Sequence, residues 1–352
     1  MKKQITKATA IAALALSLLT ACDPPMPPEA LLAQSEATYV CLPGNSSVHL
    51  DGSVNEILAS VVPGLEMNCP DMTLAETDLA TAQVSIGSLS ADGGQKWDVT
   101  VPYAVEAGVF AITSSSGAGA LLSPKSLQGI LDGSIQSWDD ASIVADNDGI
   151  APIEGPLTLT TMVQTEALEA LKVWYKHYTG KSLDASSLVV KDTVTSADYG
   201  DLVEGAVSFM PLSVFNELSI SSMITPMAAT LVADKAKDPA GAIVDFNSVY
   251  AGSSQWRNDQ KAPGSLGVNL DFDAVPVPPA GFDAAPTPYQ ILYPVYLRIS
   301  SSDDLVARAV ARYLLRQDSQ ALFTLVYGLP TDIRAAAIDL VSQGLKIPTP
   351  QP

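Results

Sequence analysis

Short apolar segments of strand type alternate with segments of helical spacing along most of this chain, and this alternation limits the possible folds more than any other feature. Strands are predicted over residues 37–42, 82–87, 201–211 and 289–300, with a pair of buried strands over 99–113. Helices are predicted from a capping-box pattern at Thr73, and over 126–132, 165–178, 302–316, 318–327 and 331–344. Residues 43–47 are expected to form a loop, and 225–288 a weakly structured excursion with one helix. The alternation predicts an α/β fold with a mostly parallel sheet.

The first 21 residues have the order of a secretory signal. A basic head precedes the apolar run ATAIAALALSLLT at 8–20, which is too short to span a bilayer. The Leu-Thr-Ala-Cys that follows resembles the bacterial lipoprotein box, in which Cys22 becomes the lipidated first residue, with palmitate expected in the anchor. An ordinary cleaved signal with an incidental Cys is the alternative. The protein is therefore predicted to lie on the extracytoplasmic face of the cell envelope, with 22–38 as a flexible tether.

The charge balance excludes several classes of partner. The chain has 19 Lys and Arg against 38 Asp and Glu, a formal net charge of −19. Such a field repels nucleic acids and anionic lipid headgroups, so no nucleic-acid binding is predicted. No later segment holds 18 apolar residues in a row, so the lipid on Cys22 is the only expected link to a membrane.

The three cysteines divide into one anchor and one pair. With Cys22 lipidated, Cys41 and Cys69 remain as an even pair in an oxidising compartment, which favours a disulfide. Two buried thiols are the alternative. Neither a Cys-x-x-Cys motif nor a neighbouring His pair accompanies them, so no metal site and no cofactor are predicted.

One motif in the middle of the chain carries a family resemblance. Residues 127–143 contain the pattern Gly-x-Ile-x-x-Trp-x-Asp-x-x-Ile, formed by Gly133, Ile135, Trp138, Asp140 and Ile143. Together with further segments in the same order, this stretch resembles the phosphate-binding protein of bacterial ABC transporters. The further segments are VSIG at 84–87, GAVSFM at 205–210, Tyr293-Pro294 and YGLP at 327–330. Trp138 itself is interpreted as a core aromatic residue, so the motif supports the fold and not the ligand.

The resemblance implies an α/β, two-lobed, periplasmic-binding-protein-like fold of type II. Lobe one would comprise 39–103 plus 290–345, lobe two 104–289, and 346–352 would be a frayed tail. Two crossing strands near 101–105 and 293–297 would form the hinge, and a solute would be trapped between the lobes on closure.

The residues that would hold phosphate match the family poorly. The resemblance places the family's Arg near Thr161 and its Ser-Gly-Thr turn at Glu166 and the two residues after it. Glu166 would satisfy the positive end of a helix dipole and repel an incoming dianion, or it is a helix-start residue with no function. The family's accepting Asp falls at Ser90, with Asp92 as a substitute. The candidate ligand-binding residues are Ser46, Ser47, Thr73, Ser88, Ser90, Thr161 and Glu166, although loop and cap chemistry also explains each hydroxyl.

Three functions compete at this point. The first is a lipid-anchored solute-binding protein that delivers phosphate or another small solute to the permease of an ABC importer. The second is a non-transport envelope lipoprotein, a sensor or scaffold, that keeps the fold and has lost the phosphate site. The third, a secreted hydrolase, is disfavoured because the chain has two His and neither a Gly-x-Ser-x-Gly nor a His-Glu-x-x-His motif. We therefore expect a binding protein and not an enzyme.

Overall fold

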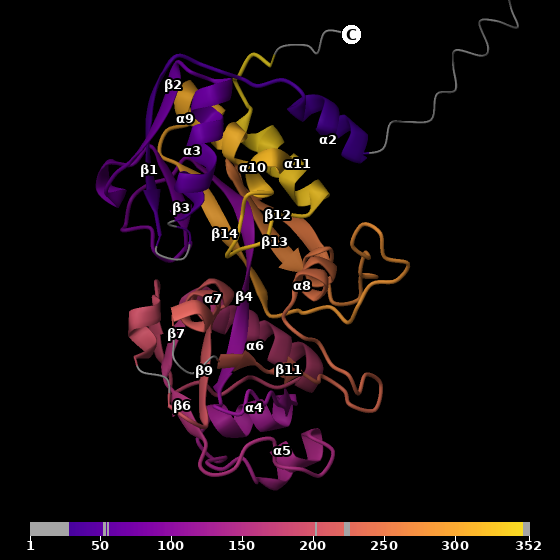
Figure 1. Cartoon of the computed structure of the whole chain (residues 1–352). Helices are drawn as coiled ribbons and strands as arrows, with labels where there is room; N and C mark the ends of the chain where they lie inside the picture. The colour runs from indigo at the N-terminus through magenta and orange to yellow at the C-terminus, as the bar shows by residue number, and fades with distance from the viewer. Residues whose placement is uncertain (1–27, 52–53, 55, 201–202, 222–225, 348–352) are drawn as a thin grey trace, which may run out of the picture.

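The computed structural model describes residues 28–51, 54, 56–200, 203–221 and 226–347, and it places them in two stacked lobes (Figure 1). The signal segment, Cys22 and most of the expected tail lie outside these residues. Among the helices described, none is long and apolar enough to cross a membrane.

Lobe one is built on a mixed sheet in the order β12-β13-β4-β14-β3-β1-β2. Its first three strands are parallel: β1 (Gly44–Leu50), β2 (Met72–Glu76) and β3 (Val84–Gly87). Strand β14 (Leu292–Ile299) runs antiparallel between β3 and β4, so the sheet is mixed and not mostly parallel as predicted. The helices of this lobe are α2 (Pro28–Glu36), α3 (Glu56–Asn68), α9 (Leu305–Leu314), α10 (Gln317–Gln320) and α11 (Thr331–Val341), with a short 3-10 turn η2 (Leu79–Thr81).

Strand β4 (Val99–Thr113) joins the two lobes. The pair of strands predicted here is one 15-residue strand whose residues are almost all buried, because both of its faces are covered along its length. Its first half pairs with β14, and its second half pairs antiparallel with β9 (Ala206–Pro211) and β10 (Pro226–Ala228) of lobe two. Strand β14 begins at the junction, where Leu292 lies opposite Ala107.

In the part of the chain that the structure describes, lobe two surrounds the second half of β4 with short strands and four helices. The helices are α4 (Pro124–Leu131), α5 (Ala141–Asp146), α6 (Thr165–Thr179) and α7 (Leu212–Ser221). The short strands are β5 (Leu121–Leu122), β6 (Thr158–Thr160), β7 (Met162–Gln164), β8 (Val189–Lys191) and β11 (Thr230–Leu231), and a 3-10 turn η3 spans Ser196–Tyr199. Trp138 is fully buried, and its indole Nε1 donates to the carbonyl of Gly205 at 3.0 Å, which agrees with its interpretation as a core residue.

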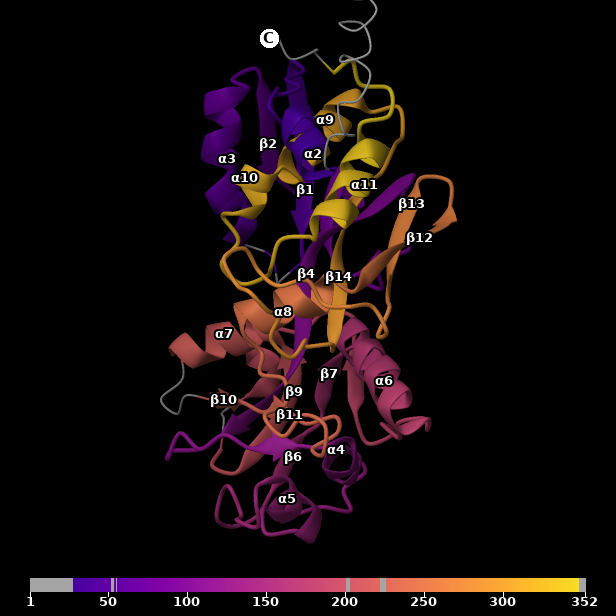
Figure 2. The ribbon, with the colours of Figure 1, turned by 90° about the vertical axis from the view of Figure 1, so that its right-hand side faces the viewer.

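The segment 225–288 is more ordered than its composition indicates. It holds helix α8 (Phe246–Ser253), as expected, and also a hairpin of β12 (Trp256–Ala262) and β13 (Ser265–Leu270). The hairpin joins the edge of the lobe-one sheet, where Ser265 pairs with Thr100 of β4. It therefore belongs to lobe one, although the expected boundaries of 104–289 place it in lobe two. Figure 2 shows the hairpin in the upper lobe, on the same side of the molecule as α6 in the lower lobe.

Three predictions near the N-terminus are wrong. The strand predicted at 37–42 is irregular, whereas the predicted loop at 43–47 belongs to β1. Thr73 begins no helix, because it lies in β2, where Met72 and Leu74 are buried and Thr73 is exposed. The same residues that match a capping box also alternate between buried and exposed positions, as expected for a strand. The predicted Cys41–Cys69 disulfide is confirmed, with 5.2 Å between the two Cα atoms.

The expected tether is partly folded. Helix α2 lies against α11, with Leu32 buried and the carboxylate of Glu36 paired with the guanidinium of Arg334. The guanidinium groups of Arg334, Arg316 and Arg312 each donate to an atom of the segment 35–36, at the end of this helix. The predicted helix at 318–327 is also shorter, since α10 ends at Gln320.

Candidate functional site

The carboxyl ends of the parallel strands β1 and β3 point towards the junction of the lobes, where ligands commonly bind in open α/β sheets. The loop after β3 carries Ser88 and Ser90, and Asp51 directly follows β1. The backbone N–H of Ser88 donates to Asp51 Oδ2 at 2.9 Å. A Cβ atom on Gly87 would lie 2.2 Å from the Cβ of Asp51, so this close packing of the two loops requires glycine.

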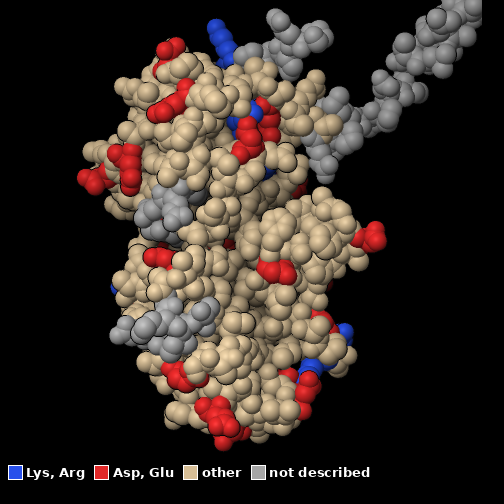
Figure 3. Space-filling model, in the orientation of Figure 1, with Lys and Arg blue, Asp and Glu red and all other residues tan. Residues whose placement is uncertain are grey.

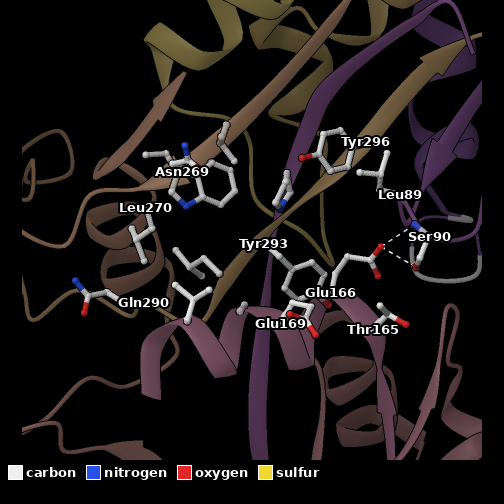
Figure 4. A pocket seen from close by; sticks show the side chains of 16 residues that line it. Leu89, Ser90, Thr165, Glu166, Glu169, Asn269, Leu270, Gln290, Tyr293 and Tyr296 are labelled. Carbon is white, nitrogen blue, oxygen red and sulfur yellow. Dashed lines mark hydrogen bonds between the residues drawn. The ribbon is translucent and has the colours of Figure 1, made fainter. Parts of the chain in front are cut away.

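Glu166 reaches this loop from the other lobe. It lies in the first turn of α6, and its Oε1 atom accepts three hydrogen bonds from lobe one. The donors are the hydroxyl of Ser88 at 2.6 Å, the backbone N–H of Ser90 at 2.9 Å and the hydroxyl of Ser90 at 2.9 Å. Figure 4 shows the contact with Ser90. The carboxylate therefore occupies a cradle of N–H and O–H donors, the arrangement that proteins use to bind an anion.

A buried arginine lies beneath the cradle. Arg298 of β14 is 1 % exposed, donates from Nη2 to Ser85 Oγ at 2.9 Å and to the carbonyl of Ala91 at 3.3 Å, and packs on the ring of Trp97. Burial lowers the pKa of the Arg298 guanidinium, and the carboxylates of Asp51, Asp92 and Glu166 oppose that shift. The side chain remains a guanidinium cation, so the cradle has a fixed positive charge behind it.

A pocket of about 460 Å³ opens beside Glu166 between the two lobes. Lobe one contributes the loop after β3, the β12–β13 hairpin and β14, and lobe two contributes the first turns of α6 (Figure 4). Its size falls within the range of small-molecule sites. Its lining residues are Leu89, Ser90, Thr165, Glu166, Glu169, Ala170, Val173, Trp256, Val268, Asn269, Leu270, Gln290, Leu292, Tyr293, Pro294 and Tyr296.

The structure brings together three of the predicted ligand-binding residues: Ser88, Ser90 and Glu166. Ser46 and Ser47 lie in the first half of β1, away from its carboxyl end, and Ser47 binds Gln83 and the carbonyl of Thr81. Thr73, exposed on β2, donates to Asn45. The sequence predicts a strand at 37–42 followed by a loop at 43–47, whereas β1 begins only at Gly44. Residues 44–47 therefore lie at the start of the strand and not at its carboxyl end.

Thr161 is exposed between β6 and β7 and does not line the pocket. The arginine of the site comes instead from β14, far along the chain at Arg298, and no local motif marks it. An isolated Arg within the apolar strand LYPVYLRI was the available signal. Trp256 and Tyr296 were not predicted as site residues. Trp256 lies in the segment that was expected to be weakly structured, and Tyr296 lies in a strand that was expected only to form part of the hinge.

One more ionisable group lies at the junction. Glu106 of β4 is 1 % exposed, and its Oε1 accepts from the backbone N–H of Ala107 at 3.0 Å and of Ser213, at the start of α7, at 3.3 Å. Burial raises the pKa of the Glu106 carboxyl to about 7, and the hydrogen bonds from Ser213 and Ala107 oppose that rise. The junction therefore holds an acidic group that titrates near neutral pH.

No family model matches the sequence, and no curated protein is significantly similar to it. Solved structures are similar. A high-affinity periplasmic phosphate-binding protein with bound phosphate, PfluDING, has a TM-score of 0.54 and 16 % identity, over 87 % of this chain and 97 % of that chain. A DING protein has a TM-score of 0.50 and 14 % identity, over 86 % and 97 % of the two chains. At these identities the likeness concerns the fold, and the chain has the two-lobed α/β fold of periplasmic binding proteins.

Proposed function

We propose that this protein is an extracytoplasmic solute-binding protein, anchored by lipid at Cys22, that presents a small solute other than free phosphate to the permease of an ABC importer. The two-lobed fold and the similarity to phosphate-binding proteins support a binding role and not an enzymatic one. The signal-like first 21 residues and the following Cys support the location.

One observation carries the choice of solute: Glu166 Oε1 accepts hydrogen bonds from both Ser88 and Ser90. A free oxyanion would need the same donors, and it would meet the negative charge of Glu166 at short range. The solute is therefore expected in the adjacent pocket, where the carboxylate forms part of the wall.

Thermal denaturation in the presence of phosphate tests this proposal. A ligand that binds only the folded state raises Tm with its concentration. We expect millimolar phosphate to leave the Tm of the wild type unchanged and to raise that of Glu166→Ser, which removes the occupying carboxylate. Glu154→Ser, a change at an exposed residue outside the pocket, should behave as the wild type. A phosphate-dependent rise of Tm in the wild type would refute the exclusion of phosphate.

The non-transport alternative rests on the same contact, because a cleft bridged by its own carboxylate can keep its shape with no solute. A thermal-shift panel of sulfate, molybdate, organic acids, amino acids and amines separates the two functions. If none of these compounds raises the Tm of the wild type, the sensor or scaffold role is favoured over solute capture.

A further inference from the structure

The interlobe pocket differs in chemistry from the cradle beside it. Its wall is dominated by apolar and aromatic side chains. Trp256 is 2 % exposed, and Figure 4 shows Tyr293 near the centre of the view with Tyr296 above it. Leu89 on lobe one is 45 % exposed and Val173 on lobe two is 52 % exposed, and both line the opening. Exposed apolar side chains on both sides of one opening favour a ligand with an apolar body that buries them.

The charged groups of the wall are all acidic. Glu166 and Glu169 lie one turn apart on α6, whereas neither Lys nor Arg is among the lining residues. Burial and the charges of Glu166 and of Asp259 on β12 raise the pKa of the Tyr296 hydroxyl to about 12, so the phenol in the wall is neutral. An anionic ligand would thus meet carboxylates on entry.

Two basic groups lie near the pocket, and neither is among its lining residues. Lys172 binds Glu169 Oε1 at 2.8 Å from the next turn of α6, and both side chains are well exposed, so this pair screens the carboxylate only weakly. Arg298 lies buried behind the Ser88–Ser90 loop, where its Nη2 donates to Ser85 and Ala91, and its Nε and Nη1 are also buried. Its guanidinium does not line the pocket, so an anion there would contact the carboxylates of Glu166 and Glu169 first.

We infer that the pocket binds an apolar organic cation, an ammonium group on an aromatic or aliphatic body, and this inference rests on the solute-binding role proposed above. The body would pack on Trp256, Leu270 and Val173, and the ammonium would lie at the end of the pocket formed by Glu166 and Glu169 (Figure 4). Aromatic faces such as that of Tyr296 attract a cation at the same end. The net charge of −19 draws cationic solutes towards the protein.

Three probes with the same ring system test the charge class. Tryptamine is a cation, tryptophol is neutral and indole-3-propionate is an anion, and each is titrated into the detergent-purified protein by calorimetry. We expect tryptamine to bind at least about tenfold more tightly than indole-3-propionate, with tryptophol between them. Glu169→Gln should weaken tryptamine by about threefold, as expected for an exposed carboxylate, and leave tryptophol unchanged, whereas Glu154→Gln should change neither.

The outcomes separate this inference from the proposed function. Equal binding of the three probes, or tighter binding of the anion, would overturn the charge class and leave the pocket as a solute site. Failure of all three to bind would overturn the inference, while the phosphate and solute panel would still decide the broader role. An equal loss of tryptamine and tryptophol affinity in Glu169→Gln would assign the residue to packing and contradict the electrostatic argument.

Discussion

Ser88 of lobe one donates its hydroxyl to Glu166 of lobe two, with 2.6 Å between Ser88 Oγ and Glu166 Oε1. This contact crosses the junction between the two lobes. In proteins that close around a ligand, the ligand supplies such bridging interactions. Here a side chain of the chain itself supplies such a bridge, beside the pocket between the lobes (Figure 4).

Removal of this bridge is expected to loosen the two lobes. Glu166→Ala eliminates three hydrogen bonds between the lobes, which leaves the buried hydrogen bond from the Tyr293 hydroxyl to Gln164 in place. Small-angle X-ray scattering should show a larger radius of gyration for Glu166→Ala than for the wild type. Glu154→Ala is the matched control and should scatter as the wild type does. Identical curves for all three proteins would mean that β4 and the packing around it hold the lobes without help from Glu166.

Stability is expected to decrease as pH rises through the range in which Glu106 titrates. Its folded-state pKa of about 7 lies above the ordinary value of 4.5, so the native state keeps a proton that the unfolded chain has lost. The free energy of unfolding should fall by roughly 2–3 kcal/mol between pH 4.5 and pH 7 from this group. Glu106→Gln should abolish that part of the slope in urea denaturation series. A slope that persists unchanged in the variant would assign the pH dependence to other groups.

The docking of α2 depends on a buried ion pair. The Glu36 and Arg334 side chains are 8 % and 6 % exposed, so Glu36→Ala leaves an uncompensated buried guanidinium. We expect a loss of about 3–5 kcal/mol in the free energy of unfolding, measured with urea. Lys172→Ala breaks the exposed pair with Glu169 and should cost at most about 1 kcal/mol. Similar small losses for both variants would show that α2 contributes little to the folded lobe.

The Cys41–Cys69 disulfide should stabilise lobe one. It joins residues 28 positions apart, and the entropy of closing that loop is worth about 3–4 kcal/mol in the unfolded chain. Dithiothreitol is expected to lower the urea midpoint of the wild type. The double variant Cys41→Ala/Cys69→Ala should show the lower midpoint from the start and no response to the reductant. A reductant effect in the double variant would point to a cause other than this bond.

Several elements could be predicted because local chemistry dominates them. Helix α6 follows from apolar residues at helical spacing, and α9 begins after Asp304, whose carboxylate accepts from the N–H of Ala307 at 2.9 Å. The Cys41–Cys69 pairing could be predicted because two cysteines remain after Cys22 and an oxidising compartment was expected. By contrast, β2 was predicted as a helix, because a five-residue strand fits both a capping pattern and a strand alternation.

The sequence by itself determined the α/β class and the disulfide pair, and it marked Glu166 as a departure from the residues of the phosphate-binding proteins that the chain resembles. Only the tertiary structure decided what Glu166 does, because its partners Ser88 and Ser90 lie 78 and 76 residues away in the chain. Arg298 reaches the same place from 132 residues further along. Spacing along a chain reports local structure, whereas long-range strand pairing sets which distant polar groups meet. In the folded protein the carboxylate of Glu166 accepts hydrogen bonds from Ser88 and Ser90, a pairing that no local pattern in the sequence indicates.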